Sequence, residues 1–288
     1  MPKQRKLSVS VLNITVQPHS PQKYVELFND VFKQKNACKY YGEKFGIISK
    51  LEDIEEKTGI LALFGEISIF TNINKDAPWF NFESLEEAAE NDIMEIKIPD
   101  KLRPNLTKCF FVFNAIKHQM FFITKNGQDM SFGGTCIKKF IYNLFNTEQN
   151  IQKFGDIAVN LIPESNIIDK LFSYPHLSKL NIVLTPPNPD DLADEEAKLM
   201  EKLNTMRAKK MEQSYTAERR TTSLNVDEET RRLSEIASNN GYVSVVAKDV
   251  YGISIIDSTK EHPLVITRQY DEDDDVRQQL ISIMKEKN

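Results

Sequence analysis

The sequence has little of what small or specialised folds depend on. Its 288 residues include three cysteines, Cys38, Cys109 and Cys136, without a CxxC pair, which argues against a disulfide scaffold and is typical of buried thiols in a reducing cytoplasm. No uncharged apolar stretch approaches the roughly 18 residues of a membrane-spanning helix. Residues 1–6 are basic, but polar residues alternate after them where a signal peptide would be apolar. We therefore expect a cytoplasmic protein that does not engage a membrane.

Neither sign of charge dominates the chain. It has 37 Lys and Arg against 42 Asp and Glu, a net charge of −5, which excludes a strongly cationic coat for nucleic acid but permits a local basic face. Hydrophobic residues make up 40% of the chain and charged residues 27%. This balance allows a buried core and excludes a wholly disordered or collagen-like protein.

A cluster of prolines at 186–189 separates two parts of different charge. Residues 1–185 contain 22 Lys and Arg and 21 Asp and Glu, for a net charge of +1, whereas residues 186–288 contain 15 and 21, for −6. Because such a cluster interrupts regular structure, we predict a boundary there. The expected parts are an α+β sheet domain over 1–185 and a helical C-terminal region with a β-hairpin over 186–288.

Alternating apolar and polar residues predict short strands, and three- or four-residue spacing predicts single helices between them. Residues 7–16 fit a strand, and Ser20 followed by Pro21 begins a helix. Further strands are expected at 38–49, 60–70, 109–113, 120–124, 157–162 and 180–184, with helices at 136–145 and 165–172. This order predicts an α+β fold, a mostly antiparallel sheet layered with helices on one face, which is compatible with two ferredoxin-like halves.

The C-terminal region is predicted to hold helices and a hairpin. A charged helix is expected at 190–215, a second helix at 227–238, and a hairpin at 242–256. The first helix carries a narrow apolar stripe, typical of a helix that pairs with another chain. We assign the stripe to oligomerisation, and its members are Leu192, Leu199, Leu203 and Met206. A homo-oligomer is therefore expected, and packing of the stripe against the body of the same chain is the alternative.

No residue pattern indicates catalysis, a metal site or a cofactor. The four histidines lie far apart, and HExxH, CxxC, GxSxG and P-loop patterns are all missing. The one enzymatic alternative is a metal-dependent nuclease, in which Glu95 and Lys97 on one strand act with the upstream Asp76 to hold a metal and polarise a phosphodiester. An exposed strand edge explains the same residues, because Glu-x-Lys is common in so charged a chain.

Paired basic residues are the best indication of a ligand. Phosphate contacts from such pairs give binding that depends on salt and tolerates many sequences, and ion pairs on the surface are the alternative explanation. The candidates for nucleic-acid binding are Lys138, Lys139, Arg207, Lys209, Lys210, Arg219 and Arg220. The aromatic residues Trp79, Phe80 and Phe82 are also able to stack on bases, although a core position is expected for side chains of this kind.

Short segments along nearly the whole chain together resemble the bacterial domain-of-unknown-function family 4747. They are LNIT at 12–15, PHSP at 18–21 with Tyr24, APWFN at 77–81, LRPN at 102–105, PNPDDL at 187–192, NGYV at 240–243, STK at 258–260 and HP at 262–263. Members of this family resemble proteins found on mobile elements and in defence-related neighbourhoods of bacteria. The resemblance thus implies a role in phage interference or its regulation and supplies no catalytic residues.

We therefore expect a non-enzymatic cytoplasmic binding protein of bacterial anti-phage defence or mobile-element interference. DNA or RNA is the expected partner, and a partner protein of a defence system is a further expectation. The alternatives are a metal-dependent nuclease effector and a dimeric scaffold that does not bind nucleic acid. No cofactor and no metal are expected.

Overall fold

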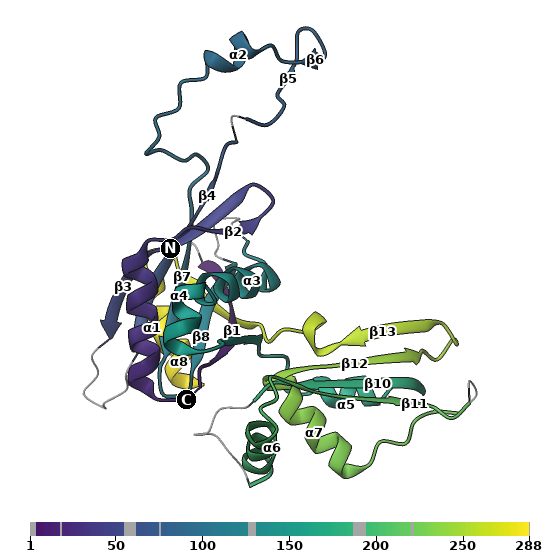
Figure 1. The fold of residues 1–288 in the computed structure, drawn as a ribbon. Helices are drawn as coiled ribbons and strands as arrows, with labels where there is room; N and C mark the ends of the chain where they lie inside the picture. Colours follow the sequence, from purple (N-terminus) through teal and green to yellow (C-terminus); the bar gives the residue numbers. More distant parts are fainter. Residues whose placement is uncertain are drawn as a thin grey trace.

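The computed structural model describes residues 4–17, 19–54, 62–74, 76–125, 131–186, 194–219 and 222–287. They form an eight-stranded antiparallel sheet, a four-stranded antiparallel sheet beside it, and an arm of residues 72–106 that projects from the larger sheet (Figure 1). Antiparallel strands and helices are interspersed along the chain, which confirms the predicted α+β class. Within the described residues the strands do not divide into two ferredoxin-like halves, because eight of them join one continuous sheet.

The larger sheet is organised around its first strand. Its strands in spatial order are β14 (Ile266–Asp271), β1 (Gln4–Thr15), β8 (Gln119–Lys125), β7 (Thr107–Asn114), β4 (Ala62–Thr71), β3 (Lys44–Ile54) and β2 (Cys38–Tyr41), and β9 (Ala158–Leu161) also pairs with β1. One edge of β1 pairs with β8, while the other edge pairs first with β14 and then with β9. The strand at the N-terminus was predicted from alternation, and strands were also predicted at 109–113 and 120–124, within β7 and β8.

Helices cover both faces of the larger sheet, where the sequence predicted one covered face. The helices are α1 (Pro21–Gln34), α3 (Gly134–Phe145) and α4 (Glu148–Phe154) on one face, and α8 (Val276–Glu286) on the other. Along β1, Leu7 and Val9 pack in the core with α8, whereas Leu12 and Ile14 pack in the core with α1 and α3. Both faces of this strand are therefore buried, and large aromatic side chains such as Phe28 fill the space on the α1 side.

Local signals explain where α1 begins and ends. The Ser20 hydroxyl accepts a hydrogen bond from the Lys23 backbone N–H at 3.2 Å, and Pro21 follows at the first helical position, as predicted. Lys35 ends the helix in the left-handed conformation with a φ of 52°. Tyr24, Leu27, Phe28 and Val31 form its buried face, so the helix is fixed to the sheet by one apolar stripe.

The smaller sheet carries its own helices. Its strands in spatial order are β11 (Met211–Thr216), β10 (His176–Leu184), β12 (Gly241–Lys248) and β13 (Ser254–Ser258). The helices α5 (Ile167–Phe172), α6 (Asp194–Thr205) and α7 (Glu228–Asn239) pack on it, and the short 3₁₀ helix η2 (Thr259–Glu261) follows β13. The core between them is aliphatic, with side chains such as Ile182 and Val243 fully buried.

The two sheets do not divide at residue 185. Strand β10 precedes this position and pairs with β11 and β12, which follow it. The last elements of the chain, β14 and α8, return to the larger sheet. Two chain segments thus cross between the sheets, and they meet where Pro163 and Pro263 form an isolated bridge.

The predicted helix at 190–215 is wrong in its second half. Helix α6 ends at Thr205, and after a turn the chain continues as β11, which pairs with β10. The turn closes as a helix cap: the Ala208 N–H donates to the Leu203 carbonyl at 2.9 Å, and the Arg207 N–H donates to the Asn204 carbonyl at 3.0 Å. Arg207 takes the left-handed position, with a φ of 52°, that glycine usually occupies. Because no glycine or proline marks this stop, the apolar spacing alone did not reveal it.

The arm has little contact with the rest of the chain. It leaves the larger sheet after β4 and returns at β7, and its outer part carries β5 (Phe80–Asn81), β6 (Glu86–Glu87) and α2 (Glu90–Met94) (Figure 1). Phe80 and Phe82, for which a core position was expected, are 57% and 85% exposed there. Among the described residues, no helix is both long and apolar enough to cross a membrane.

Candidate functional site

A cleft of about 660 Å³ lies at the junction of the two sheets. Its floor is the edge strand β9, one wall is α3, and the other wall is the end of α6 with the turn that follows it. Apolar side chains such as Val159 and Leu203 line part of the surface, and the Tyr142 ring, 43% exposed, stands at the α3 wall. This volume is in the range of pockets that hold molecules of nucleotide size.

Three of the predicted basic residues meet at this cleft. Lys138 reaches it from α3, and Arg207 and Lys209 reach it from the turn between α6 and β11. The chain separates these positions by about 70 residues, so only the junction of the sheets brings them together. Asp156 is the one carboxylate among the described lining residues, and it pairs with Lys209 at 3.1 Å.

Among the described residues, two of these cations have no anionic partner. In the described part of the chain, neither the Lys138 ammonium nor the Arg207 guanidinium makes an ion pair, whereas the neighbouring Lys209 and Lys210 do. Burial lowers the pKa of Lys138 below its ordinary value of 10.5, and the positive charge of Lys260 lowers it further. An anion placed in the cleft would relieve this repulsion, so the site favours a negatively charged ligand.

Lys260 extends the positive surface beyond the cleft. It lines a small hollow of about 50 Å³ together with Lys138, Thr135 and Gly241. The Lys260 ammonium lies 3.1 Å from the centroid of the Tyr242 ring, which holds it through a cation–π contact. Burial also lowers the pKa of Lys260. We call the surface formed by Lys138, Arg207, Lys209 and Lys260 the basic cleft; the sequence did not single out Lys260, because it stands alone among uncharged and acidic neighbours.

The remaining basic candidates do not line the basic cleft. Lys139 is exposed on α3, and Lys210 pairs with Glu212 at 2.6 Å. Arg219 is exposed in the loop after β11, and Arg220 lies outside the described residues. Ion pairing at the surface, the alternative weighed above, therefore accounts for Lys210.

The apolar stripe assigned to oligomerisation is largely used inside the chain. Leu203 is 3% exposed, and Leu199 is half-buried against the same core of the smaller sheet. Met206 is 66% exposed, and Leu192 lies outside the described residues. Packing of the stripe on the body, the alternative interpretation, thus fits Leu199 and Leu203, and Met206 is the described member that a partner can reach.

The nuclease candidates lack the strand that they were expected to share. Glu95 ends α2 on the arm, and Lys97 follows it in irregular chain, so both are exposed far from the core strands (Figure 1). In the residues that the structure describes, no group of three or more His, Cys, Asp or Glu side chains is placed to hold a metal ion. The geometry therefore gives no support to metal-assisted hydrolysis at these residues.

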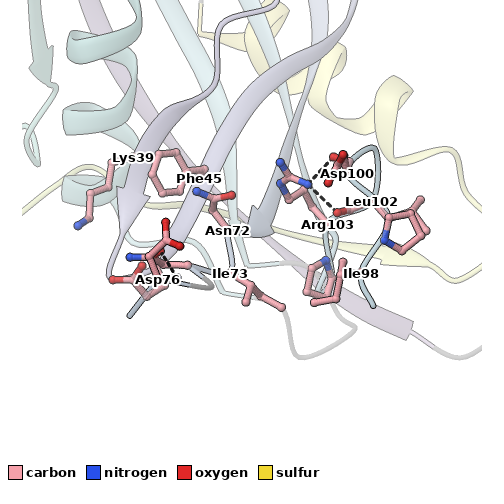
Figure 2. Close-up of a pocket in the computed structure, with 13 residues that line it drawn as sticks. Lys39, Phe45, Asn72, Ile73, Asp76, Ile98, Asp100, Leu102 and Arg103 are labelled. Atoms are coloured by element: carbon pink, nitrogen blue, oxygen red, sulfur yellow. Dashed lines mark hydrogen bonds between the residues drawn. The ribbon is translucent and has the colours of Figure 1, made fainter. Parts of the chain in front are cut away.

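A second pocket, of about 550 Å³, lies at the base of the arm (Figure 2). It contains charges of both signs, including Lys39, Asp76 and Arg103. The Arg103 guanidinium is used internally, since its Nη1 donates to the backbone carbonyls of Asp100 at 2.7 Å and Leu102 at 2.8 Å (Figure 2). This pocket thus lies where the arm joins the larger sheet, and its positive and negative side chains leave it without the excess positive charge of the basic cleft.

Comparison with known proteins identifies the family of the chain. The family model described as "Domain of unknown function (DUF4747)" matches residues 5–285. No curated protein matches the chain. The match spans both sheets and the arm, so the basic cleft lies entirely within the region that the family model covers.

Proposed function

The chain belongs to the DUF4747 family, a domain of unknown function, and we propose from its own surface that it binds a nucleic-acid strand in the basic cleft. The observation that carries the proposal is the convergence of Lys138, Arg207 and Lys209, two of them without an anionic partner in the described residues, on one cleft. The overall net charge is −5, so this local excess of cations stands out from the rest of the surface.

The shape of the cleft favours a single strand. A volume of about 660 Å³ receives a nucleotide or two, while a duplex would contact only its rims. Lys138 and Arg207 are positioned as phosphate partners, and the exposed Tyr142 ring offers a face on which a base can stack. Phosphate contacts and stacking on a base do not depend on which base is present, so binding should tolerate many sequences.

Anisotropy titrations with labelled oligonucleotides test the proposal. We expect 20-mers of single-stranded DNA or RNA to bind more tightly than the corresponding duplex, with affinity that falls as salt rises. The paired substitution Lys138→Gln with Arg207→Ala should reduce the slope of log affinity against log salt by about 1.4, or roughly 0.7 for each phosphate that the protein no longer neutralises.

Lys248→Gln is the matched control. Lys248 is exposed at the far end of β12, seven residues from Gly241, which puts it roughly 23 Å from the small hollow at about 3.3 Å per residue. It should leave both affinity and slope unchanged. The proposal fails if no oligonucleotide binds at about 50 mM salt, or if the paired substitution has no more effect than the control.

We further propose that the protein acts in the bacterial cytoplasm, as part of an anti-phage or mobile-element system. The support for this setting is the resemblance noted in the sequence. In a host that carries the chain and its neighbouring genes, the Lys138→Gln and Arg207→Ala pair should restore phage plating, whereas Lys248→Gln should not. If phage plate equally well on both variants, nucleic-acid binding in the cleft is not required for the anti-phage role.

A further inference from the structure

The tip of the arm, residues 79–95, forms a small folded unit of its own. The Ala88 N–H donates to the Trp79 carbonyl at 2.7 Å, which closes the β5–β6 pair, and the Asn81 side chain donates to Asp92 at 3.2 Å. The Phe80 and Phe82 rings meet edge to face, with centroids 5.3 Å apart. The tip thus presents a defined surface.

This surface is both apolar and acidic. Phe82, Leu85 and Met94 are 85%, 69% and 74% exposed, an unusual concentration of large apolar side chains on one short segment. The same residues 79–95 contain six carboxylates and no Lys or Arg. The carboxylates are Glu83, Glu86, Glu87, Glu90, Asp92 and Glu95. They would repel phosphates, so stacking of Phe80 and Phe82 on nucleic-acid bases is disfavoured, and a cationic surface with apolar walls is the better match.

The base of the arm directs the tip away from the rest of its own chain (Figure 1). The Thr71 N–H donates to the Pro104 carbonyl and the Asn72 N–H to the Glu43 carbonyl, both at 2.9 Å. The Arg103 contacts fix the returning segment (Figure 2). The Thr71 and Asn72 bonds tie the base of the arm to the larger sheet, so the tip is available to another molecule.

We propose that the arm tip of one copy docks in the basic cleft of a second copy, which returns its own arm to the first. The carboxylates of the tip meet Lys138, Arg207, Lys209 and Lys260, and the exposed apolar side chains of the tip meet the exposed Tyr142 ring at the wall of the cleft. Because each chain carries both surfaces, a two-fold exchange closes on itself and leaves no tip or cleft unfilled. This interaction uses the same cleft as the nucleic acid but does not depend on nucleic-acid binding.

Sedimentation of the full chain tests the exchange. The wild-type protein should sediment at twice the chain mass of 33.2 kDa, with a dissociation constant that rises with salt as the charges are screened. An arm variant, Phe82→Ser with Leu85→Ser, and a cleft variant, Lys138→Glu with Arg207→Glu, should each sediment at the mass of a single chain. All four residues are exposed or half-buried, and circular dichroism checks that the variants remain folded.

Mixing the two variants gives the sharpest result. The arm variant keeps a working cleft and the cleft variant keeps a working arm, so the equimolar mixture should regain a heterodimer held by one of the two contacts. A wild-type protein that stays at the mass of one chain overturns the proposal, as does a mixture that stays monomeric or an arm variant that still dimerises.

A matched control uses apolar residues of equal exposure elsewhere. Val250 and Tyr251 are 77% and 85% exposed at the turn between β12 and β13, and Val250→Ser with Tyr251→Ser should leave the dimer mass unchanged. Loss of the dimer in this control would assign the association to a different surface and overturn the proposal. Oligonucleotide binding is measured separately by anisotropy, so a failure of strand binding and a failure of arm exchange give different results.

Discussion

Replacing Arg207 by glycine should stabilise the fold and weaken nucleic-acid binding at the same time. Arg207 holds the left-handed position of the α6 cap, with a φ of 52°, and its side chain makes no ion pair in the described part of the chain. A left-handed conformation costs a residue with a Cβ about 1–2 kcal/mol. Glycine would remove that cost, so an arginine at this position gives up some stability while it places a cation at the cleft.

The expected gain follows from two opposing contributions. Relief of the left-handed conformation contributes about 1–2 kcal/mol. The greater freedom of glycine in the unfolded chain takes back roughly 0.5–1 kcal/mol. Arg207→Gly should therefore raise the free energy of unfolding by about 0.5–1 kcal/mol, which at this chain length shifts the melting temperature by roughly 1–3 °C. Calorimetry or urea unfolding measures the gain, and oligonucleotide anisotropy measures the weaker binding.

Two further substitutions separate conformation from charge. Arg207→Ala keeps the strained backbone and removes the charge, so it should weaken binding as much as glycine without the gain in stability. Lys35→Gly relieves the same strain at the end of α1, where φ is also 52°, and should stabilise the protein without affecting binding. A lower stability for Arg207→Gly, or oligonucleotide binding that is unchanged in both Arg207→Gly and Arg207→Ala, would refute the reasoning.

Three other outcomes follow from the same contacts. Burial and Lys260 lower the pKa of Lys138, so this side chain loses its positive charge at a pH below the ordinary pKa of 10.5. Oligonucleotide affinity should therefore fall as pH rises from about 8 to about 10, and it should fall less for Lys138→Gln. In the free protein the unfolded chain keeps this proton to higher pH, so the free energy of unfolding measured by urea titration should rise through that window more steeply in the wild type than in Lys138→Gln. Gly241→Ala should destabilise the protein by about 1–3 kcal/mol in urea unfolding, since the added Cβ would lie 2.0 Å from the Val183 carbonyl oxygen and the backbone must move. Leu203→Ala should cost about 2–5 kcal/mol as a buried truncation yet leave the sedimenting mass unchanged, and a loss of the dimer in the folded variant would return this residue to the oligomer interface.

Elements with strong local signals were predicted correctly from the sequence. Alternation located β1, strands were expected within β7 and β8, and apolar spacing located α3. Elements that depend on distant partners were missed or misassigned. Strand β14 is fixed by pairing with β1 at the other end of the chain, and β11 follows a helix stop that no glycine or proline announces.

The candidate site was predictable in its residue types but not in its assembly. Lys138 and Arg207 were selected because cations in pairs contact phosphates, yet Lys139, beside Lys138, does not line the cleft. The basic residues converge because the chain passes from the larger sheet to the smaller one, so that the turn after α6 lies beside β9 at the cleft. The sequence around Phe80 and Phe82 did not predict that these side chains are exposed. Apolar side chains are usually buried, but the arm lies too far from either core for these two to pack there.

A cleft that receives both a nucleic-acid strand and an acidic arm cannot hold the two at once. Lys138 and Arg207 would contact phosphates in one state and carboxylates in the other, so each ligand lowers the apparent affinity of the other by the same factor. The arm would then limit strand binding to conditions in which the strand outcompetes it. Replacing Phe82 and Leu85 by serine should therefore tighten oligonucleotide binding, although neither residue touches the strand, and excess oligonucleotide should convert the wild-type dimer to single chains. Serine variants that bind no more tightly than the wild type would show that the arm and the strand occupy separate sites.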